Sequence, residues 1–197
     1  MTMDELLELE KSGNLPEFVL FWGGTQAKGR LSQWYPSPFT VDGVEYPTAE
    51  HFMMCEKARL FGDDAVVGEI LASPEPGRAK ALGRKVRGFD EDTWVEHRYD
   101  IVRRGSVAKF ASDPVLRGYL LSTGGKVLVE ASPLDRVWGI GYDEHAPEAG
   151  RPSQWRGLNL LGFALMDARD ELSAAAAGGA GADAGPNAGA DAGRGIG

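Results

Sequence analysis

The hydrophobic and polar positions divide the chain into amphipathic segments and short apolar runs, which predict helices and strands respectively. Residues that favour helix starts and ends, such as Thr48, Asp113-Pro114 and Gly88, set the expected boundaries. Helices are expected at about 1–13, 48–61, 63–71, 75–84, 90–110, 113–121 and 158–172. Strands are expected at 17–22, 39–41, 44–46 and 126–131, with a tight hairpin turn at Asp42-Gly43.

Helices dominate this pattern, and the strands are few, short and expected at the edges of the fold. The sequence therefore predicts a mainly α fold with a small β element (α+β), in a single helical domain over residues 16–172. Residues 1–15 form an acidic N-terminal extension. Residues 173–197 are almost all Ala, Gly and Asp, and they are expected to be disordered because they cannot bury enough apolar surface to offset ordering entropy.

The charge balance excludes some classes of partner. The 197 residues carry a net charge of −8, and the pI is near 4.9. Both values argue against a general binder of nucleic acid or of anionic membranes, while leaving room for a local basic pocket. The N-terminus lacks the pattern of a signal peptide, and no apolar run is long enough to span a bilayer. A cytoplasmic protein without a membrane partner is expected.

Metal and cofactor chemistry receive no support from the sequence. Cys55 is the single cysteine and there are three histidines, so neither an internal disulfide nor a Cys/His metal site is expected. Phosphate-loop, dinucleotide-binding, Gly-x-Ser-x-Gly and His-Glu-x-x-His patterns do not occur. No cofactor is predicted.

The segment that follows Pro47 carries the first candidate site. Glu50, Met54 and Lys57 share one face of the predicted helix, whose remaining surface is largely apolar. A carboxylate and an amine in such surroundings cost free energy unless they are paired or used. A Glu50–Lys57 pair that only fixes packing and a functional pair are equally supported by the spacing.

Three further segments carry candidate functional residues. Arg84, within a basic run, is the best candidate for a phosphate clamp, whereas Lys80 and Lys85 favour a solvated basic face. Asp135 and Trp138 lie in a glycine-bounded loop after a predicted strand, where function is often found. Asn159, near a helix start, either hydrogen-bonds a ligand or caps the helix, and the cap is favoured.

Taken in order, a series of short motifs resembles one family. The motifs are Pro47-Thr48-Ala49-Glu50-His51-Phe52, Glu56-Lys57, Ala79-Lys80-Ala81-Leu82-Gly83-Arg84, Trp94, Lys109-Phe110, Leu120-Leu121-Ser122-Thr123-Gly124, Leu128-Val129-Glu130, Asp135, Trp138-Gly139-Ile140-Gly141, and Gly157-Leu158-Asn159-Leu160-Leu161-Gly162 with Met166 and Arg169. Their order and spacing resemble the NADAR, or YbiA-like, family from about Phe18 to Leu172. The chain departs from the family at Ser32-Gln33-Trp34, where Ser-Asn-Phe is common, and in a longer loop at 142–156.

The resemblance implies a mainly helical fold and N-glycosidase activity on the bond between a ribose and a nitrogen. It implies as substrate either a small phosphorylated ribosyl-amine, such as a phosphoribosylamino-pyrimidine of riboflavin synthesis, or an ADP-ribosyl group on guanine, including guanine in a nucleic acid. No oligomeric state follows from it.

Such a reaction requires a group that protonates the leaving nitrogen and a group that stabilises positive charge on the ribose. We assign general acid/base work to Glu50 and cation stabilisation or water positioning to Asp135. Lys57 either pairs with Glu50 or a phosphate, or attacks the opened sugar to form a Schiff base. The expected substrate-binding residues are Arg30, Ser32, Trp34, Arg84, Trp94, Trp138 and Asn159, with plain core packing equally weighted for Trp94.

Two other functions remain open at this point. The same pocket suits a non-catalytic sensor that binds ADP-ribose or a nucleotide. Alternatively, the chain is a structural interaction module whose acidic tail recruits partners.

Overall fold

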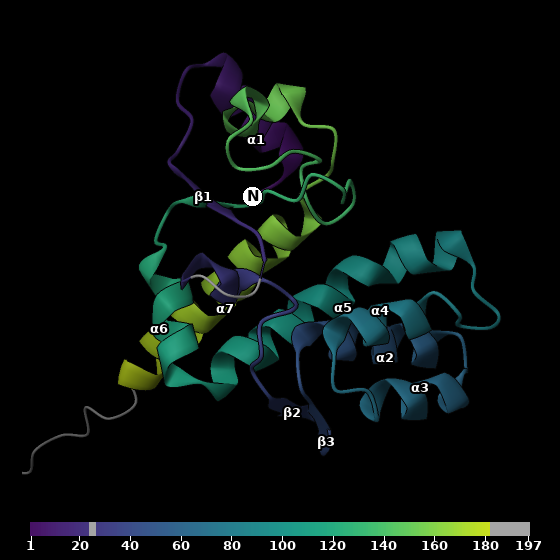
Figure 1. Cartoon of the computed structure of the whole chain (residues 1–197). Helices are drawn as coiled ribbons and strands as arrows, with labels where there is room; N and C mark the ends of the chain where they lie inside the picture. Colours follow the sequence, from purple (N-terminus) through teal and green to yellow (C-terminus); the bar gives the residue numbers. More distant parts are fainter. Residues whose placement is uncertain (24–26, 182–197) are drawn as a thin grey trace, which may run out of the picture.

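The computed structural model describes residues 1–23 and 27–181 of the chain (Figure 1). Its helices are α1 (Met3–Lys11), α2 (Ala49–Leu60), α3 (Asp64–Leu71), α4 (Pro76–Gly83), α5 (Glu91–Ser112), α6 (Pro114–Ser122) and α7 (Leu160–Gly181). Its strands are β1 (Phe18–Phe21), β2 (Phe39–Val41), β3 (Val44–Tyr46) and β4 (Val127–Glu130), and short 3-10 turns occur at η1 (Ala27–Leu31), η2 (Pro147–Gly150) and η3 (Pro152–Gln154). The predicted mainly helical fold with a small β element is confirmed.

The two longest helices form the centre of the fold. Helix α5 packs along α7, and α2 packs against α3, α4 and α5, so that α2–α4 form a group on one side of α5 (Figure 1). Gly105 of α5 permits the close approach to α2, because a Cβ there would lie 2.6 Å from Cδ1 of Phe52. No helix within the described ranges is long and apolar enough to cross a membrane.

The strands form two separate pairs, one of which lies in the core. Strands β2 and β3 make the predicted antiparallel hairpin, with positive φ at Asp42 and Gly43. Strands β1 and β4 pair in parallel, with Phe18 opposite Val127 and Phe21 opposite Glu130. The expectation that the strands lie at the edges was wrong for β4, since Val127, Leu128 and Val129 have no exposed surface. An unbroken apolar run is typical of a parallel strand that is covered on both faces.

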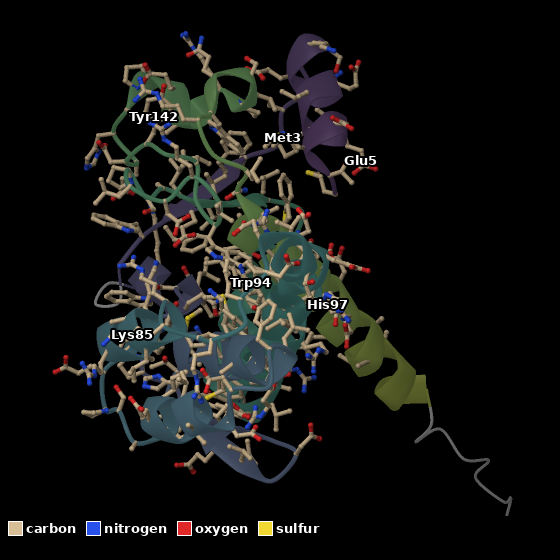
Figure 2. The ribbon with its side chains drawn as sticks, turned by 90° about the vertical axis from the view of Figure 1, so that its right-hand side faces the viewer. Met3, Glu5, Lys85, Trp94, His97 and Tyr142 are labelled. Carbon is tan, nitrogen blue, oxygen red and sulfur yellow. The ribbon has the colours of Figure 1, made fainter. Side chains whose placement is uncertain are left out.

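The N-terminal extension is packed on the domain. Leu6 of α1 is fully buried, and the Glu10 carboxylate accepts hydrogen bonds from the backbone N–H and hydroxyl of Ser153 in η3. Figure 2 shows Met3 and Glu5 on this helix near the segment that carries Tyr142.

The last helix is longer than predicted. Helix α7 continues past Leu172 to Gly181, so the first part of the segment expected to be disordered is helical. The run Ala174–Ala177 explains the extension, because alanine has the highest helix propensity. The remainder of that segment, 182–197, lies outside the described residues, as do 24–26.

Candidate active site

Two cavities meet at a shared wall between helices α2, α4 and α5 and the loop that follows β4. The smaller cavity has a volume of about 260 Å³ and the larger about 620 Å³. Four residues line both cavities: Lys80, Arg84, Asp135 and Val137. The wall therefore combines cations with a carboxylate, and the predicted Asp135 is part of it.

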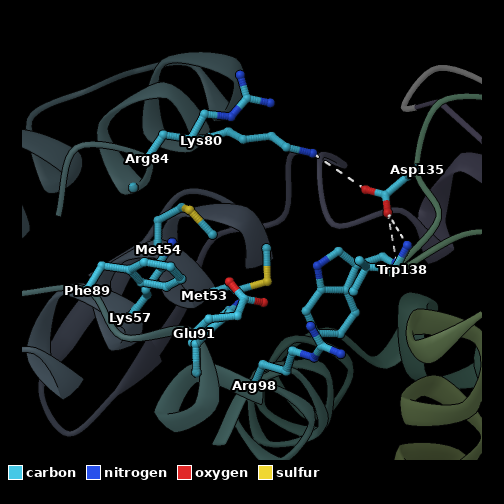
Figure 3. Close-up of a pocket in the computed structure, with 13 residues that line it drawn as sticks. Met53, Met54, Lys57, Lys80, Arg84, Phe89, Glu91, Arg98, Asp135 and Trp138 are labelled. Carbon is cyan, nitrogen blue, oxygen red and sulfur yellow. Dashed lines mark hydrogen bonds and ion pairs between the residues drawn. The ribbon is translucent and has the colours of Figure 1, made fainter. Parts of the chain in front are cut away.

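The loop after β4 fixes Asp135 in one orientation. Its Oδ1 accepts hydrogen bonds from the backbone N–H groups of Val137 (2.9 Å) and Trp138 (2.8 Å). Its Oδ2 lies 3.7 Å from Nζ of Lys80, which extends from α4 across the cavity (Figure 3). The expectation of a solvated basic face for Lys80 was wrong, because its amine faces this carboxylate. Both oxygens of Asp135 are thus held by donors or a cation.

Glu50 lies in the first turn of α2, behind this wall. Thr48 caps the helix, and the Glu50 backbone N–H donates to the carbonyl of Gln33. The side chain is 2% exposed; Oε2 accepts a hydrogen bond of 3.2 Å from Nε1 of Trp34, and Oε1 has no partner in the described part of the chain. A buried oxygen without a partner is costly for the charged form of the carboxyl group.

The surroundings shift the pKa of Glu50 upward. Burial raises this pKa to about 7, and the charge of Asp135 acts in the same direction, whereas Lys80, the Trp34 hydrogen bond and Arg84 act against it. A substantial fraction of the carboxyl groups is then protonated near neutral pH. This is the state that a general acid requires.

Glu130, which the sequence analysis left without a role, adds a second buried carboxyl group. It ends β4 and lines the larger cavity but not the smaller one. Its Oε2 has no partner among the described residues, and burial, followed by the charge of Asp135, raises its pKa to about 8. An acidic residue directly after the apolar run Val127–Val129 was the available sequence signal.

Lys57 does not pair with Glu50, contrary to one of its predicted roles. Seven residues span about two helical turns, or roughly 10 Å along the axis, so the two groups face different neighbours. The Lys57 amine lies 4.1 Å from the ring centroid of Phe89 and 5.4 Å from that of Trp94. It lines the smaller cavity, and burial lowers its pKa.

The other predicted binding residues fall into two groups. Those that line a cavity are Trp94 and Trp138 in the smaller one, Ser32 and Trp34 in the larger one, and Arg84 in both. Arg30 and Asn159 line neither. The guanidinium of Arg30 lies 5.3 Å from the ring centroid of Tyr119.

The side chains of Asn159 and Gln33 are buried beside the site and contact the protein interior. The fully buried Asn159 side chain accepts from the N–H of Glu130 and donates to the carbonyl of Leu128, which fastens it to β4. The side chain of Gln33, the residue at which the chain departs from the common Asn of the family, is buried with Nε2 3.9 Å from Sδ of Met53. Cys55 is also buried, and burial raises the pKa of its thiol to about 12, in keeping with inert packing.

Residues 20–173 match the model of the NADAR domain. The chain belongs to the NADAR domain family. The predicted family is thereby confirmed, and the match covers both cavities and every candidate residue named above.

Relatives within the NADAR family include proteins named as enzymes. N-glycosidase R617 of Acanthamoeba polyphaga mimivirus is 39% identical over 163 residues, which cover 79% of this chain and 96% of that protein. The riboflavin biosynthesis protein VVA0006 of Vibrio vulnificus is 29% identical over 162 residues, which cover 82% of this chain but 40% of that protein. The NMR structure of Escherichia coli YbiA superimposes with a TM-score of 0.69 at 28% identity, covering 83% of this chain and 89% of that chain.

Proposed function

We propose that this NADAR-family chain is an N-glycosidase that hydrolyses the C1′–N bond of a phosphorylated ribosyl-amine. The observation that carries the proposal is the buried, protonatable carboxyl group of Glu50 behind the Lys80–Asp135 pair, where two cavities meet. The relatives named N-glycosidase support the reaction class.

The site supplies both groups that the reaction requires. Protonated Glu50 donates its proton to the leaving nitrogen as the C1′–N bond breaks and its electron pair moves to that nitrogen. The carboxylate of Asp135 stabilises the positive charge that develops on the ribosyl carbon. Water then adds to that carbon and gives its proton to the Glu50 carboxylate, which restores the acid. Two buried carboxyl groups beside an ionised one provide the difference in protonation that sugar hydrolysis uses.

The position of the lysines bears on a covalent route. A Schiff base with the opened sugar forms only if an amine lies beside the reacting carbon. Lys80 is at the shared wall, 3.7 Å from Asp135, whereas Lys57 lies among the aromatic rings of the smaller cavity. If the reaction includes such an intermediate, Lys80 has the better position for it.

Two substrate classes fit a C1′–N bond in a phosphorylated ribosyl group. The relatives named riboflavin biosynthesis proteins favour a phosphoribosylamino-pyrimidine. The second class is an ADP-ribosyl group attached to guanine, which places a pyrophosphate where the first substrate has one phosphate.

Product analysis by mass spectrometry tests the proposal. The protein is incubated separately with a phosphoribosylamino-pyrimidine, with ADP-ribosylated guanine in DNA, and with NAD, and Glu50→Gln serves as the inactive control. We expect release of the free pyrimidine and ribose 5-phosphate from the first. Release of ADP-ribose from the second alone would assign the nucleic-acid substrate. Binding without turnover of any substrate would contradict the enzyme proposal and support the sensor.

A further inference from the structure

We infer that the substrate lies across both cavities in one direction, with the phosphorylated end of its ribosyl group in the smaller cavity and the leaving base in the larger cavity. This inference rests on the proposed function and adds to it a direction and a set of specificity residues.

The smaller cavity has an unsatisfied excess of positive charge. Lys57 from α2, Arg84 at the end of α4 and Arg98 from α5 all line it (Figure 3). Within residues 1–23 and 27–181, none of the three has a carboxylate within the 4.0 Å of an ion pair. Of the acidic groups that line the cavity, Asp135 is already paired with Lys80, which leaves Glu91 against three cations.

This arrangement is unusual for a chain whose net charge is −8. Three cations from different helices that line one cavity without a carboxylate partner form a site for an anion, and phosphate is an anion that arginine binds well. The amine of Lys57 is held between Phe89 and Trp94 by cation–π contacts, so its position is preorganised.

The volumes indicate that one ligand uses both cavities. Sites for small molecules have volumes of roughly 300–1,000 Å³. The smaller cavity, at about 260 Å³, lies below this range and suits part of a ligand, while the larger one, at about 620 Å³, has room for a base and more. The shared wall at Lys80 and Asp135 is where the two parts of the ligand join.

The carboxyl groups define the side of the leaving base. Glu130 lines the larger cavity only, and the hydrogen bond from Trp34, itself a lining residue of that cavity, holds Glu50. Burial raises the pKa of Glu50 to about 7 and that of Glu130 to about 8, so a substantial fraction of each carboxyl group is protonated near pH 7 and can donate to the nitrogen that leaves. A phosphate placed there would lie beside the carboxyl groups of Glu130 and Asp135, whereas in the smaller cavity it meets Lys57 and Arg98 in addition to the shared Arg84.

The mouth of the larger cavity suits a flat heterocycle. Trp22, Trp34 and Leu134 line it and are 58%, 44% and 91% exposed, which is high for large apolar side chains. Aromatic faces of this kind stack on planar rings. A base that leaves toward this mouth reaches solvent without passing the phosphate.

A variant of the smaller cavity that weakens binding of the phosphorylated substrate only would test the proposed direction of the substrate. Steady-state kinetics are measured with a phosphoribosylamino-pyrimidine and with its dephosphorylated ribosyl form. We expect Arg98→Gln to raise KM for the phosphorylated substrate by about tenfold or more, since a charged hydrogen bond is lost, and to change KM for the dephosphorylated form less than about twofold. The matched control is Arg103→Gln, an arginine of the same helix paired with Asp100 and Glu171 outside both cavities.

A variant in the larger cavity distinguishes the proposed direction of the substrate from the reverse direction. Arg136 lines the larger cavity only. We expect Arg136→Gln to affect both substrates alike, because both carry the same base. A phosphate-selective effect of Arg136→Gln, or an equal effect of Arg98→Gln on both substrates, would overturn the inference.

A binding measurement separates this inference from the proposed function. Ribose 5-phosphate is titrated calorimetrically into the wild type, Arg98→Gln and Arg103→Gln, which requires no turnover. Weakened binding in Arg98→Gln alone supports the phosphate position even if the wild type hydrolyses neither substrate and the proposed reaction fails. Equal binding by all three proteins would refute the phosphate position even in an active enzyme.

Discussion

Glu50 and Lys109 are buried ionisable residues, Glu130 is partly buried, and the surroundings of the three differ. Each glutamate keeps one oxygen without a partner in the described structure; Glu130 lines the larger cavity, and Glu50 lies behind the wall that the two cavities share. The Lys109 amine, in contrast, donates to the carbonyl oxygens of Arg30 and Ser32, each at 2.8 Å. The glutamates thus have spare hydrogen-bonding capacity for a ligand, and Lys109 holds the segment that carries Ser32.

Removing the Lys109 amine should destabilise the fold. We expect Lys109→Met to lower the free energy of unfolding by about 1–3 kcal/mol, because two buried carbonyl groups lose their donor while the stem stays packed. Urea unfolding measures the change. The matched control is the exposed Lys85→Met; equal midpoints for the two variants would show that Lys109 is not a structural support.

At the level of single residues, the sequence identified groups whose local context was unusual. Glu50 was found because it is a carboxylate in an apolar helix, and Asp135 because it follows a strand in a glycine-bounded loop. Lys80 was missed because one cation in a basic run looks like any other. Lys109 was missed because a lysine in the last turn of a helix is ordinarily explained by the helix dipole.

Among the secondary-structure elements, the contact between α7 and β4 places the site. Gly162 in the first turn of α7 lies against the Leu128 carbonyl, and Asn159, with φ of 52°, bonds to the backbone of both Leu128 and Glu130. The start of the helix therefore fixes the end of the strand that carries Glu130.

Two glycine substitutions in α7 should have opposite effects. A Cβ at Gly162 would overlap the Leu128 carbonyl and the Asn159 side chain, so we expect Gly162→Ala to lower the free energy of unfolding by about 1–3 kcal/mol or more. Gly178 has no neighbour within 4 Å, and Gly178→Ala should raise it by up to about 1 kcal/mol through helix propensity. Thermal unfolding compares the two; a neutral Gly162→Ala would refute the close contact.

The elements themselves were predictable because their boundaries are local. Thr48, Asp90 and Asp113 each accept a backbone hydrogen bond at a helix start, as their residue types indicate. The parallel pairing of 18–21 with 127–130 was not predictable, because it joins segments on either side of most of the domain. No local pattern specifies which distant strand is the partner.

For the whole molecule, the buried carboxyl groups link stability to pH. The Glu50 pKa is near 4.5 in the unfolded chain and about 7 in the fold, so the folded state binds the proton more tightly. This contribution to stability is complete below pH 4.5 and is lost as the pH rises through 7. Its full size is about 3 kcal/mol.

Replacing Glu50 with glutamine, which has the same shape and no charge, isolates the contribution of Glu50 to the pH dependence of stability. We expect Glu50→Gln to gain stability relative to the wild type between pH 5 and pH 8.5, by up to about 3 kcal/mol. Glu130 is present in both proteins, so its own titration largely cancels from the difference. Urea unfolding at both pH values gives the result, and a difference that does not change with pH would contradict the raised pKa.

The site as a whole is assembled from segments that are far apart in the chain. Residues from the loop before the hairpin, from α2, α4 and α5, and from the loop after β4 surround the two cavities. The sequence identified the family and seven of the residues that line the cavities. The sequence could not show that two cavities share one wall, since this depends on tertiary packing.

Turnover by Glu50→Gln tests the central claim most directly. We expect kcat for release of the free base to fall roughly 10²-fold or more, with the fold retained, because the side chain keeps its size and loses its acidic proton. The matched control is Glu56→Gln on the same helix, whose carboxylate pairs with Arg59 and Arg104 outside the cavities. Turnover of Glu50→Gln close to that of the control would remove Glu50 from the mechanism and contradict the proposed function of the site.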